Sequence, residues 1–469
     1  NIYFLVPRRR QWVVTLGGSY IFYAAWDPAF LVLIWASTLM DFVAGRRIDA
    51  NRSNPKTMHS WLIASLTLNL GLLFVFKYLD FALDSLQGLL DGFGFGLTVP
   101  ASDLLLPVGI SFYTFQTLSY TIDVYRNKCP VEHHLGRFAV FVSFFPQLVA
   151  GPIERATHLL PQVNQTHRFD FERTRTGAIL IGWGLFKKVV IADLLAKLVD
   201  GVYADPQAAD NVYLLIATFF FAIQIYCDFS GYTDIARGLA RIMGYELSIN
   251  FARPYFSSSL TEFWRRWHIT LSSWFRDYVY IPLGGNRGTR LRVAMNTMIV
   301  FILSGLWHGA AWTFVAWGAI HGAWLLVERA WRGVVPAGER GADGTFEVRN
   351  SLSRPAGIAI TFLVVLVSWV FFRADSIGDA FYIVAHLIPT SLPSAAGLSV
   401  FGFTRAEFVL SVLVIGILFV VDLAVERQGQ LARTFDRSNL LRGALAVGIV
   451  YSVLLFDAFG GGDFIYFQF

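Results

Sequence analysis

Apolar stretches long enough to cross a lipid bilayer recur along the whole 469-residue sequence, and they constrain its fold more than any other feature. A helix of roughly 20 residues crosses about 30 Å of hydrocarbon. Of all residues 55% are hydrophobic and 15% are charged, which leaves too little polar surface for a soluble protein of this length. We therefore predict an all-α polytopic membrane protein that is surrounded by lipid and binds no nucleic acid. The apolar stretches are 11–26, 28–45, 60–81, 104–125, 138–151, 177–196, 212–243, 293–327, 355–372, 406–425 and 441–459.

Two of these stretches lack the pattern of a simple transmembrane helix. The stretch 138–151 is short for a membrane crossing and ends in Gly-Pro, which favours a re-entrant segment. Residues 293–327 are too many for one crossing and are interrupted by glycines, which favours a broken helix or a tight helical hairpin. We accordingly predict about ten or more transmembrane and re-entrant helices in a single integral-membrane domain over residues 1–469.

Lys and Arg are concentrated in some connections and almost absent from others, which indicates the side of the membrane on which each connection lies. All crossings alternate if the basic connections are cytoplasmic, 138–151 is re-entrant, and 293–327 enters and returns. The C-terminal tail, DFIYFQF, then lies outside the cytoplasm. The basic connections are 8–10, 46–56, 126–137, 155–175, 244–292 and 427–442, and those poor in Lys and Arg are 82–103, 198–210 and 378–404.

The segment 250–292 interleaves arginines with aromatic residues, and prolines and a Gly-Gly pair divide it into short helices. Ser259 or Thr261 is a suitable N-cap for the first of them. The aromatic residues recur at helical spacing, so we predict amphipathic helices at or dipping into the cytoplasmic interface, with the aromatics at headgroup level. Two interpretations of the arginines, Arg265 and Arg266 among them, stay open. They snorkel at a membrane surface, or they bind an anionic acyl donor whose phosphate oxygens pair with the planar guanidinium.

His308 lies in the middle of the 293–327 stretch, so we expect it at membrane depth. A charged side chain there costs about 2.5 kcal/mol or more, so the imidazole should be neutral, hydrogen-bonded or next to a wet cavity. A neutral imidazole is suited to removing a proton from a hydroxyl group. Gly305 and Gly309 flank His308 and allow a substrate or another helix to come close. We therefore favour a functional role for His308 over a packing role.

The other histidines give weaker indications by themselves. His321 would lie about 20 Å from His308 on a continuous helix, so a structural role is the simpler interpretation unless the helix breaks at Gly318. His268 alone has the pattern of a surface histidine in the interfacial segment. No metal-binding motif, carboxylate pair or phosphate-binding glycine loop is present, so we expect no metal and no ATP hydrolysis.

Three acidic residues also need an explanation. Asp228 lies inside an apolar stretch and requires a cationic partner or a wet lumen. Asp234 shares a helix face with Arg237 and Arg241, which indicates a local ion pair. Glu154 follows the re-entrant segment, where it could contribute to a polar funnel.

Five stretches together resemble the membrane-bound O-acyltransferase superfamily, and within it the bacterial AlgI type, the membrane subunit of alginate O-acetylation. The resemblance covers nearly the whole chain, and the tail FIYFQF at 464–469 supports it. The stretches are LLPVGISFYTFQTLSYTIDVYR (105–126), FFPQLVAGPIER (144–155), CDFSGYTDIARGLARIMG (227–244), NFARPYFSSSLTEFWRRWHITLSSWFRDYVYIPLGGNR (250–287) and SGLWHGAAWTFVAWGAIHG (304–322).

The resemblance implies two catalytic positions. The invariant histidine of the superfamily lies in its Trp-His-Gly element, which is His308 here. A second functional position precedes the Tyr-Val-Tyr-Ile-Pro element, and it corresponds to His268. The resemblance also implies a helical bundle with a central tunnel, walled by tryptophans such as Trp267 and Trp307. Further candidates for substrate binding are Arg265, Arg266, Asp228, Glu154 and His321.

The implied function is the transfer of acetyl groups across the bacterial inner membrane for O-acetylation of a secreted exopolysaccharide such as alginate. The acyl donor would be cytoplasmic acetyl-CoA or an acyl carrier protein. A periplasmic partner of the SGNH-hydrolase-like type would complete the transfer, and the C-terminus would be periplasmic. D-alanyl transfer to teichoic acid is the nearest enzymatic alternative. A transporter without chemistry and a scaffold that only holds a partner are alternatives of other classes, although carboxylates that could couple transport to ions are sparse here.

Overall fold

The computed structural model of the chain describes residues 2–100, 102, 104–334, 353–427 and 448. The regular structure of these residues is helical, and they include no β-strand. Six helices in the described ranges are long and apolar enough to cross a membrane, which confirms the prediction of an all-α polytopic membrane protein. They are Pro28–Ala50, Pro55–Gly92, Asn211–Met243, Arg290–His308, Arg354–Arg373 and Arg405–Glu426.

Some of the other predicted crossings are shorter than a full span. The stretch 11–26 contains a helix of 14 residues and 104–125 one of 16, and the latter measures about 24 Å. The stretch 138–151 contains a nine-residue helix followed by turns, which is too short to cross as a helix. The predicted crossing 441–459 and the tail 464–469 lie outside the described residues. The count of ten or more membrane helices and the central tunnel stay predictions.

Contacts along the chain divide it into two compact units. The first unit comprises residues 1–181 and 232–248, and the second comprises 182–231 and 249–469. Helix α11 contributes its first part to the second unit and its last part to the first. The single integral-membrane domain over residues 1–469 stays a prediction beside this division.

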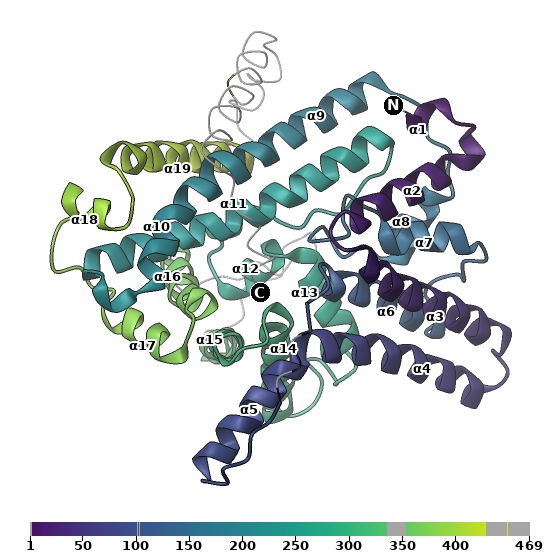
Figure 1. The fold of residues 1–469 in the computed structure, drawn as a ribbon, viewed down its shortest axis with the longest axis horizontal. Coiled ribbons are helices and arrows are strands. Elements are labelled where there is room, and N and C mark those ends of the chain that lie inside the picture. Colours follow the sequence, from purple (N-terminus) through teal and green to yellow (C-terminus); the bar gives the residue numbers. More distant parts are fainter. Residues whose placement is uncertain (1, 101, 103, 335–352, 428–447, 449–469) are drawn as a thin grey trace. The chain divides into compact units, whose positions relative to one another are not determined.

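The first unit is built around a buried polar network that joins three helices. Figure 1 shows α3 and α4 side by side, and α6 packs against both. Asp41 of α3 is fully buried and accepts hydrogen bonds from Ser65 and Asn69 of α4 and Thr121 of α6. Hydrogen bonds between side chains hold neighbouring helices together where apolar burial alone gives little specificity. The helices of this unit are α1 (Ile2–Leu5), η1 (Arg8–Arg10), α2 (Gln11–Ala24), η2 (Pro28–Phe30), α3 (Leu31–Ala50), α4 (Pro55–Leu73), η3 (Phe74–Tyr78), α5 (Leu79–Gly92), α6 (Ile110–Tyr125), α7 (Leu135–Ser143), α8 (Ala156–Val163) and most of α9 (Phe171–Leu185).

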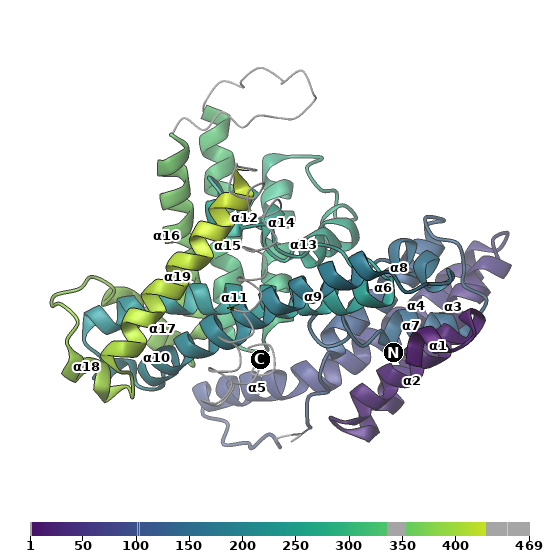
Figure 2. The same cartoon turned by 90° about the horizontal axis from the view of Figure 1, so that it is seen from above.

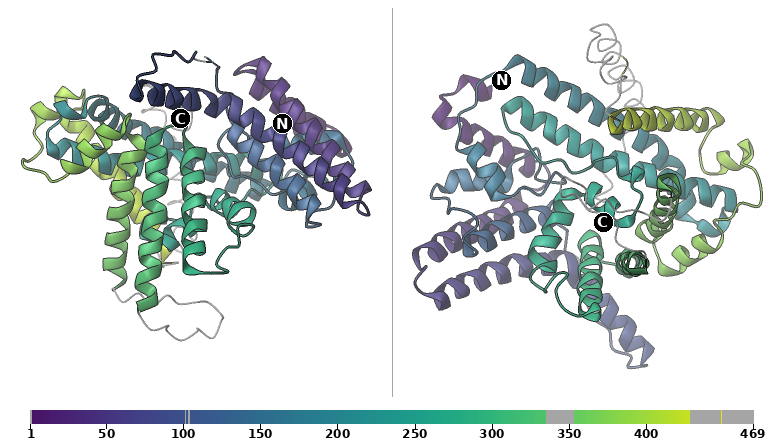
Figure 3. Two further views of the ribbon diagram at one scale, coloured as in Figure 1. Left: turned by 90° about the horizontal axis from the view of Figure 1, so that it is seen from below. Right: turned by 180° about the vertical axis from the view of Figure 1, so that it is seen from behind.

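The second unit holds the buried side chains of Trp264, Trp267, Trp317 and Trp369 in one hydrophobic core. Within it α14, α15 and α16 stand side by side, as the left panel of Figure 3 and the view in Figure 2 both show. The helices of this unit are η4 (Phe186–Ala192), α10 (Asp193–Ala204), η5 (Pro206–Ala208), α11 (Asn211–Met243, shared), η6 (Pro254–Phe256), α12 (Leu260–Arg266), α13 (Ile269–Phe275), η7 (Arg276–Tyr280), α14 (Arg290–His308), α15 (Trp312–Val334), α16 (Arg354–Arg373), α17 (Ile377–Ala385), α18 (Ala395–Val400) and α19 (Arg405–Glu426).

Helices α14 and α15 form the helical hairpin that the glycines of 293–327 predict. The break falls at residues 309–311, and Gly318 lies inside α15. The two helices approach backbone to backbone, because a methyl group at Gly305 would collide with the carbonyl oxygen of Phe314, and one at Gly318 with that of Phe301. These glycines therefore admit a neighbouring helix and not a substrate.

Helices α12 and α13 precede α14 in the sequence and form a second, shorter hairpin, which lies alongside the first. At its start, Glu328 of α15 accepts hydrogen bonds from two backbone N–H groups of α12. At its turn, His268 packs beside His308. On its return, the side-chain amide of Asn296 on α14 donates to the carbonyl oxygen of Gly285 at 3.1 Å. The α12–α13 hairpin therefore runs along α14 and α15 and places its turn next to theirs.

The aromatic residues of the α12–α13 hairpin are buried inside the protein. Phe263 and Trp267 are each 1% exposed and Trp274 is 6% exposed. Trp267 packs against Trp369 of α16 with ring centroids 5.0 Å apart. These rings pack between helices that are distant in the sequence and do not form an exposed amphipathic surface, while their depth at headgroup level stays a prediction. The predicted cap is confirmed, since the Ser259 hydroxyl accepts the N–H of Glu262 at 3.1 Å.

Candidate active site

His308 is the last residue of α14, directly before the turn of the α14–α15 hairpin. It is 3% exposed, and its ring contacts those of Trp307, Trp317 and Phe372 at centroid distances of 4.9, 5.1 and 5.4 Å. The middle of the 293–327 stretch is thus the turn of a hairpin. His308 lies at the end of a 19-residue helix, about 27 Å from its first residue, and not midway along a continuous one.

His268 occupies the turn of the α12–α13 hairpin in a left-handed backbone conformation, with φ 42° and ψ 54°. Residues other than glycine rarely adopt this conformation, and it persists where the surrounding structure holds it. Here two backbone hydrogen bonds of 2.9 Å bracket the turn, from Ala252 N–H to the Arg266 carbonyl and from Ile269 N–H to the Asn250 carbonyl. The turn is therefore fixed by the segment that precedes α12.

The two histidines predicted as catalytic come together. The ring centroids of His268 and His308 lie 6.3 Å apart, with an angle of 65° between the ring planes. Trp307 contacts both rings, at 5.8 Å from His268 and 4.9 Å from His308. On its other side His268 packs against Phe229 of α11 at 4.7 Å. The pair is enclosed by aromatic side chains, which exclude water from it.

The hydrogen bonds of Asn250 define the tautomer of His268. The Asn250 side-chain oxygen accepts the backbone N–H of Thr270 at 3.1 Å and the hydroxyl of Thr270 at 2.9 Å. A backbone N–H can only donate, so this atom of the amide must be the oxygen. The same oxygen lies 3.2 Å from Nδ1 of His268, so Nδ1 carries the proton. In the neutral ring, Nε2 then has the lone pair.

Burial keeps the His268 ring neutral. The side chain is fully buried, and desolvation lowers its pKa to about 3. At neutral pH the ring is therefore an uncharged base with its lone pair on Nε2. The expectation from sequence alone, a surface histidine, was wrong, because the hairpin turns inward.

His321 lies on α15 in the same aromatic core. It is fully buried, and its Nε2 is 2.9 Å from the hydroxyl of Ser368 on α16. That hydroxyl donates to the Val365 carbonyl, so it accepts from Nε2–H of His321. Trp317 contacts both His321 and His308, at 4.8 and 5.1 Å. The hairpin thus brings His321 much nearer to His308 than a continuous helix would, although a ring lies between them.

The two candidate arginines have different surroundings. Arg266 forms ion pairs with Glu262 at 2.8 Å and with Glu426 of α19 at 2.9 Å, and Glu426 also pairs with Arg253. The charge of Arg266 is therefore balanced by carboxylates of the protein itself. Arg265 is exposed, and no ion pair joins it to another residue of the described ranges. Of the two, Arg265 is the one that can meet an external anion.

Asp228 has the cationic partner that its position requires. Lys188 on the π-helical segment η4 pairs with Asp228 of α11 at 2.7 Å and with Asp193 at 2.8 Å. All three side chains are largely buried. Asp228 immediately precedes Phe229, whose ring packs on His268, so the ion pair helps to fix that part of α11.

Glu154 belongs to the first unit, where its carboxylate is engaged on both oxygens. It is fully buried and accepts from the backbone N–H and the hydroxyl of Ser248 and lies 2.6 Å from Nδ1 of His158. The predicted ion pair of Asp234 is with Arg237, at 3.6 Å, while Arg241 pairs with Glu246. Glu154 therefore fastens the loop after α11 to α8, and its place in a polar funnel stays a prediction.

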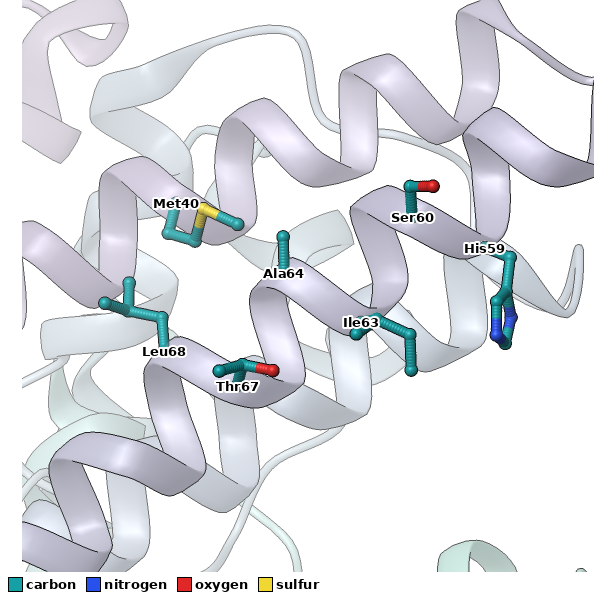
Figure 4. A pocket seen from close by; sticks show the side chains of 7 residues that line it. All are labelled: Met40, His59, Ser60, Ile63, Ala64, Thr67 and Leu68. Atoms are coloured by element: carbon teal, nitrogen blue, oxygen red, sulfur yellow. The ribbon is translucent and has the colours of Figure 1, made fainter.

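A groove is also present on the first unit. Figure 4 shows it on α3 and α4 of the first unit, between side chains that are mainly apolar. Its lining residues are Met40, His59, Ser60, Ile63, Ala64, Thr67 and Leu68, and none of them is a predicted site residue. His59 is the one titratable side chain of this lining, so the groove has no pair of acid–base groups like His268 and His308.

Several residues of the site were missed by reasoning from the sequence. Phe372 and Ser368 had no distinguishing pattern, because their importance comes from contacts between helices. Asn250 opens the quoted stretch NFARPY, but its neighbour in space is 18 positions along the chain. The role of Lys188 was not predicted, because it lies within the apolar stretch 177–196, which its length identifies as a membrane helix without indicating a partner for the lysine.

These elements define a class of protein: a polytopic membrane protein with two buried histidines at the turns of adjoining hairpins. The model of the membrane-bound O-acyltransferase family matches residues 130–339, which include both hairpins. The chain is 42% identical to a probable alginate O-acetylase of Azotobacter vinelandii over 390 residues. The aligned region covers 82% of this chain and 74% of that protein. The chain therefore belongs to the membrane-bound O-acyltransferase family, and it is a membrane-bound acyltransferase.

More distant relatives carry related activities in their names. The chain is 33% identical to a peptidoglycan O-acetyltransferase of Helicobacter pylori, over 81% of this chain and 73% of that protein. It is 29% identical to a teichoic acid D-alanyltransferase of Streptococcus thermophilus, over 57% of this chain and 68% of that protein. Family membership favours an acyltransferase over the transporter and scaffold alternatives.

Proposed function

We propose that the chain transfers acetyl groups from a cytoplasmic thioester donor for O-acetylation of a secreted exopolysaccharide such as alginate, with His268 and His308 as the catalytic residues. The observation that carries this proposal is the pair of buried imidazoles, 6.3 Å apart at the turns of two hairpins. Similarity to the alginate O-acetylases supports acetyl as the acyl group and a polysaccharide as the final acceptor.

The chemistry requires one proton transfer and one acyl transfer. An acceptor hydroxyl loses its proton to an imidazole as its oxygen attacks the thioester carbonyl carbon. The carbon–sulfur bond then breaks, and the proton passes from the imidazole to the leaving thiolate, which departs as a thiol. His268 is suited to be the base, since its Nε2 has the lone pair while Nδ1–H is held by Asn250.

The ring of His308 lies beside that of His268, with the centroids 6.3 Å apart. Hydrogen bonds of about 2.8 Å from a nitrogen of each ring to one shared oxygen are compatible with the centroid distance. His308 would then bind either the attacking hydroxyl or the thioester oxygen while His268 removes the proton. Because the surrounding aromatic rings exclude water, hydrolysis of the donor is suppressed.

The donor, the partner protein and the membrane orientation are proposed from the family resemblance and from the positions of the Lys and Arg residues. Acetyl-CoA or an acetylated carrier protein would approach from the cytoplasm, where the exposed guanidinium of Arg265 offers a contact for phosphate. A periplasmic protein of the SGNH-hydrolase-like type would receive or pass on the acetyl group. The protein would lie in the bacterial inner membrane with its C-terminus in the periplasm, as the distribution of Lys and Arg predicts.

The test is to supply the purified protein in nanodiscs with radiolabelled acetyl-CoA and an oligosaccharide or candidate partner as acceptor. We expect thiol release that depends on the acceptor, and label on the acceptor. A parallel reaction uses a D-alanyl-loaded carrier protein as donor. Transfer of D-alanine with no transfer of acetyl would overturn the proposal in favour of the activity named for the more distant relatives.

A further inference from the structure

The segment before α12 holds a residue that no catalytic motif includes, yet it determines the state of His268. Asn250 is fully buried in the second unit. Its backbone carbonyl accepts Ile269 N–H at 2.9 Å, and its side-chain oxygen accepts from His268 and twice from Thr270. One residue thus contacts three consecutive positions of the hairpin turn.

These contacts act on the backbone as well as on the ring. The left-handed conformation of His268 is costly for a residue with a side chain, by an amount on the order of 1 kcal/mol or more. The hydrogen bonds from Ile269 and Thr270 fix the residues that follow it, so the turn cannot relax without breaking them. The orientation of the imidazole and the identity of its protonated nitrogen therefore depend on the same side-chain oxygen.

We propose that Asn250 is a positioning residue of the acyltransferase, which locks His268 in the Nδ1–H tautomer and presents its Nε2 lone pair to the reacting hydroxyl. This inference rests on the proposed function for its catalytic consequence, while the tautomer itself is a property of the unliganded protein. An amide is suited to this task because it accepts a hydrogen bond without adding charge. A carboxylate at the same place would attract a proton to the imidazole and occupy Nε2.

Few other charges act on His268. From α14 the titratable neighbour is His308 at 6.3 Å. On α11 it is Asp228, next to Phe229, and its charge is balanced by Lys188. On α12 it is Arg266, which is balanced by Glu262 and Glu426. A new carboxylate at position 250 would therefore be the dominant change in the electrostatic field at the ring.

The first experiment measures the tautomer directly. Protein with 15N-labelled histidine is compared with the same protein carrying His268→Ala, which assigns the His268 signals by their loss. We expect the wild-type ring to be neutral, with a protonated Nδ1 and an unprotonated Nε2. A wild-type ring protonated at Nε2 would overturn the inference, whether or not the protein transfers acetyl groups.

The second experiment measures the pH dependence of kcat for Asn250→Asp. The substitution keeps the shape of the side chain, so the fold should be retained, and we expect the acidic limb of the profile to move to higher pH with kcat at neutral pH lowered about 10-fold or more. The matched control is Asn211→Asp at the start of α11, whose side chain donates to the Ile388 carbonyl and not to a residue of either hairpin, and its profile should stay in place. Superimposable profiles for wild type and Asn250→Asp, with a folded variant, would contradict the positioning role.

Discussion

His268 and His308 lie with their ring centroids 6.3 Å apart because each occupies the turn of a helical hairpin and the two hairpins are packed along their length. One turn contains a left-handed residue and the other an extended glycine, Gly309. The distance between the imidazoles is therefore set by the packing of α12, α14 and α15, and changes to that packing should reach the site.

The close contact of α14 and α15 gives the first prediction. Gly305→Ala would place a methyl group against the Phe314 carbonyl, and we expect a loss of about 1–3 kcal/mol of stability together with reduced acyl transfer. Thermal unfolding in detergent and turnover are the measurements. Gly416→Ala on α19 is the control, since nothing lies within 4 Å of its added methyl group. Equal behaviour of the two variants would show that the hairpin is not packed as described.

The ion pairs of Lys188 give the second prediction. Lys188→Met leaves Asp228 and Asp193 without their buried cation, and we expect destabilisation of about 3–5 kcal/mol. Adding Asp228→Asn to this variant should restore part of the lost stability, because one buried charge is removed. Thermal unfolding of the single and double variants checks this expectation, and a double variant less stable than Lys188→Met would contradict it.

Two adjacent arginines should respond differently to substitution. Arg265→Ala should raise KM for an anionic donor several-fold and leave the unfolding temperature unchanged, because Arg265 is exposed. Arg266→Ala should lower stability by on the order of 1 kcal/mol, because Glu262 and Glu426 lose a partner. Donor-dependent kinetics and thermal unfolding separate the two effects. A KM effect confined to Arg266→Ala would assign the anion contact to the other residue.

The contact between His158 and Glu154 should make stability depend on pH. The hydrogen bond to Glu154 raises the pKa of His158 above its usual value near 6.5. A raised folded-state pKa means that the contribution is fully present below about pH 6.5 and is lost as pH rises through the raised value. Unfolding temperatures measured from pH 5.5 to 8.5 should therefore fall more steeply for wild type than for His158→Gln. Parallel curves would exclude this contribution.

Reasoning from the sequence predicts the parts of this structure that depend on local pattern. The glycine-interrupted stretch 293–327 predicts a hairpin, and the hairpin is present, although its break lies at residues 309–311. The serine cap at Ser259 is likewise a local feature, and it is confirmed.

The parts that depend on contacts between distant segments could not be predicted in the same way. Spacing alone gives the α12–α13 aromatics an amphipathic surface pattern, but Trp267 is buried against Trp369 because α16 covers it. From the sequence, Gly305 indicates an open passage, but in the structure the backbone carbonyl of Phe314 occupies the space beside it. The alignment of His268 with His308 was implied only by resemblance to the family. The role of Asn250 required the hydrogen bonds themselves.

The central claim is that both buried imidazoles take part in acyl transfer. The most direct measurement is turnover of radiolabelled acetyl-CoA by wild type, His308→Ala and His268→Ala in nanodiscs, with unfolding temperatures taken on the same samples. His386→Ala on the segment after α17 is the control for loss of a histidine outside the site. We predict that each site variant loses at least about 100-fold in kcat while remaining folded, which is the usual effect of removing a general base. Turnover in a folded His308→Ala or His268→Ala variant that equals that of wild type would contradict the account.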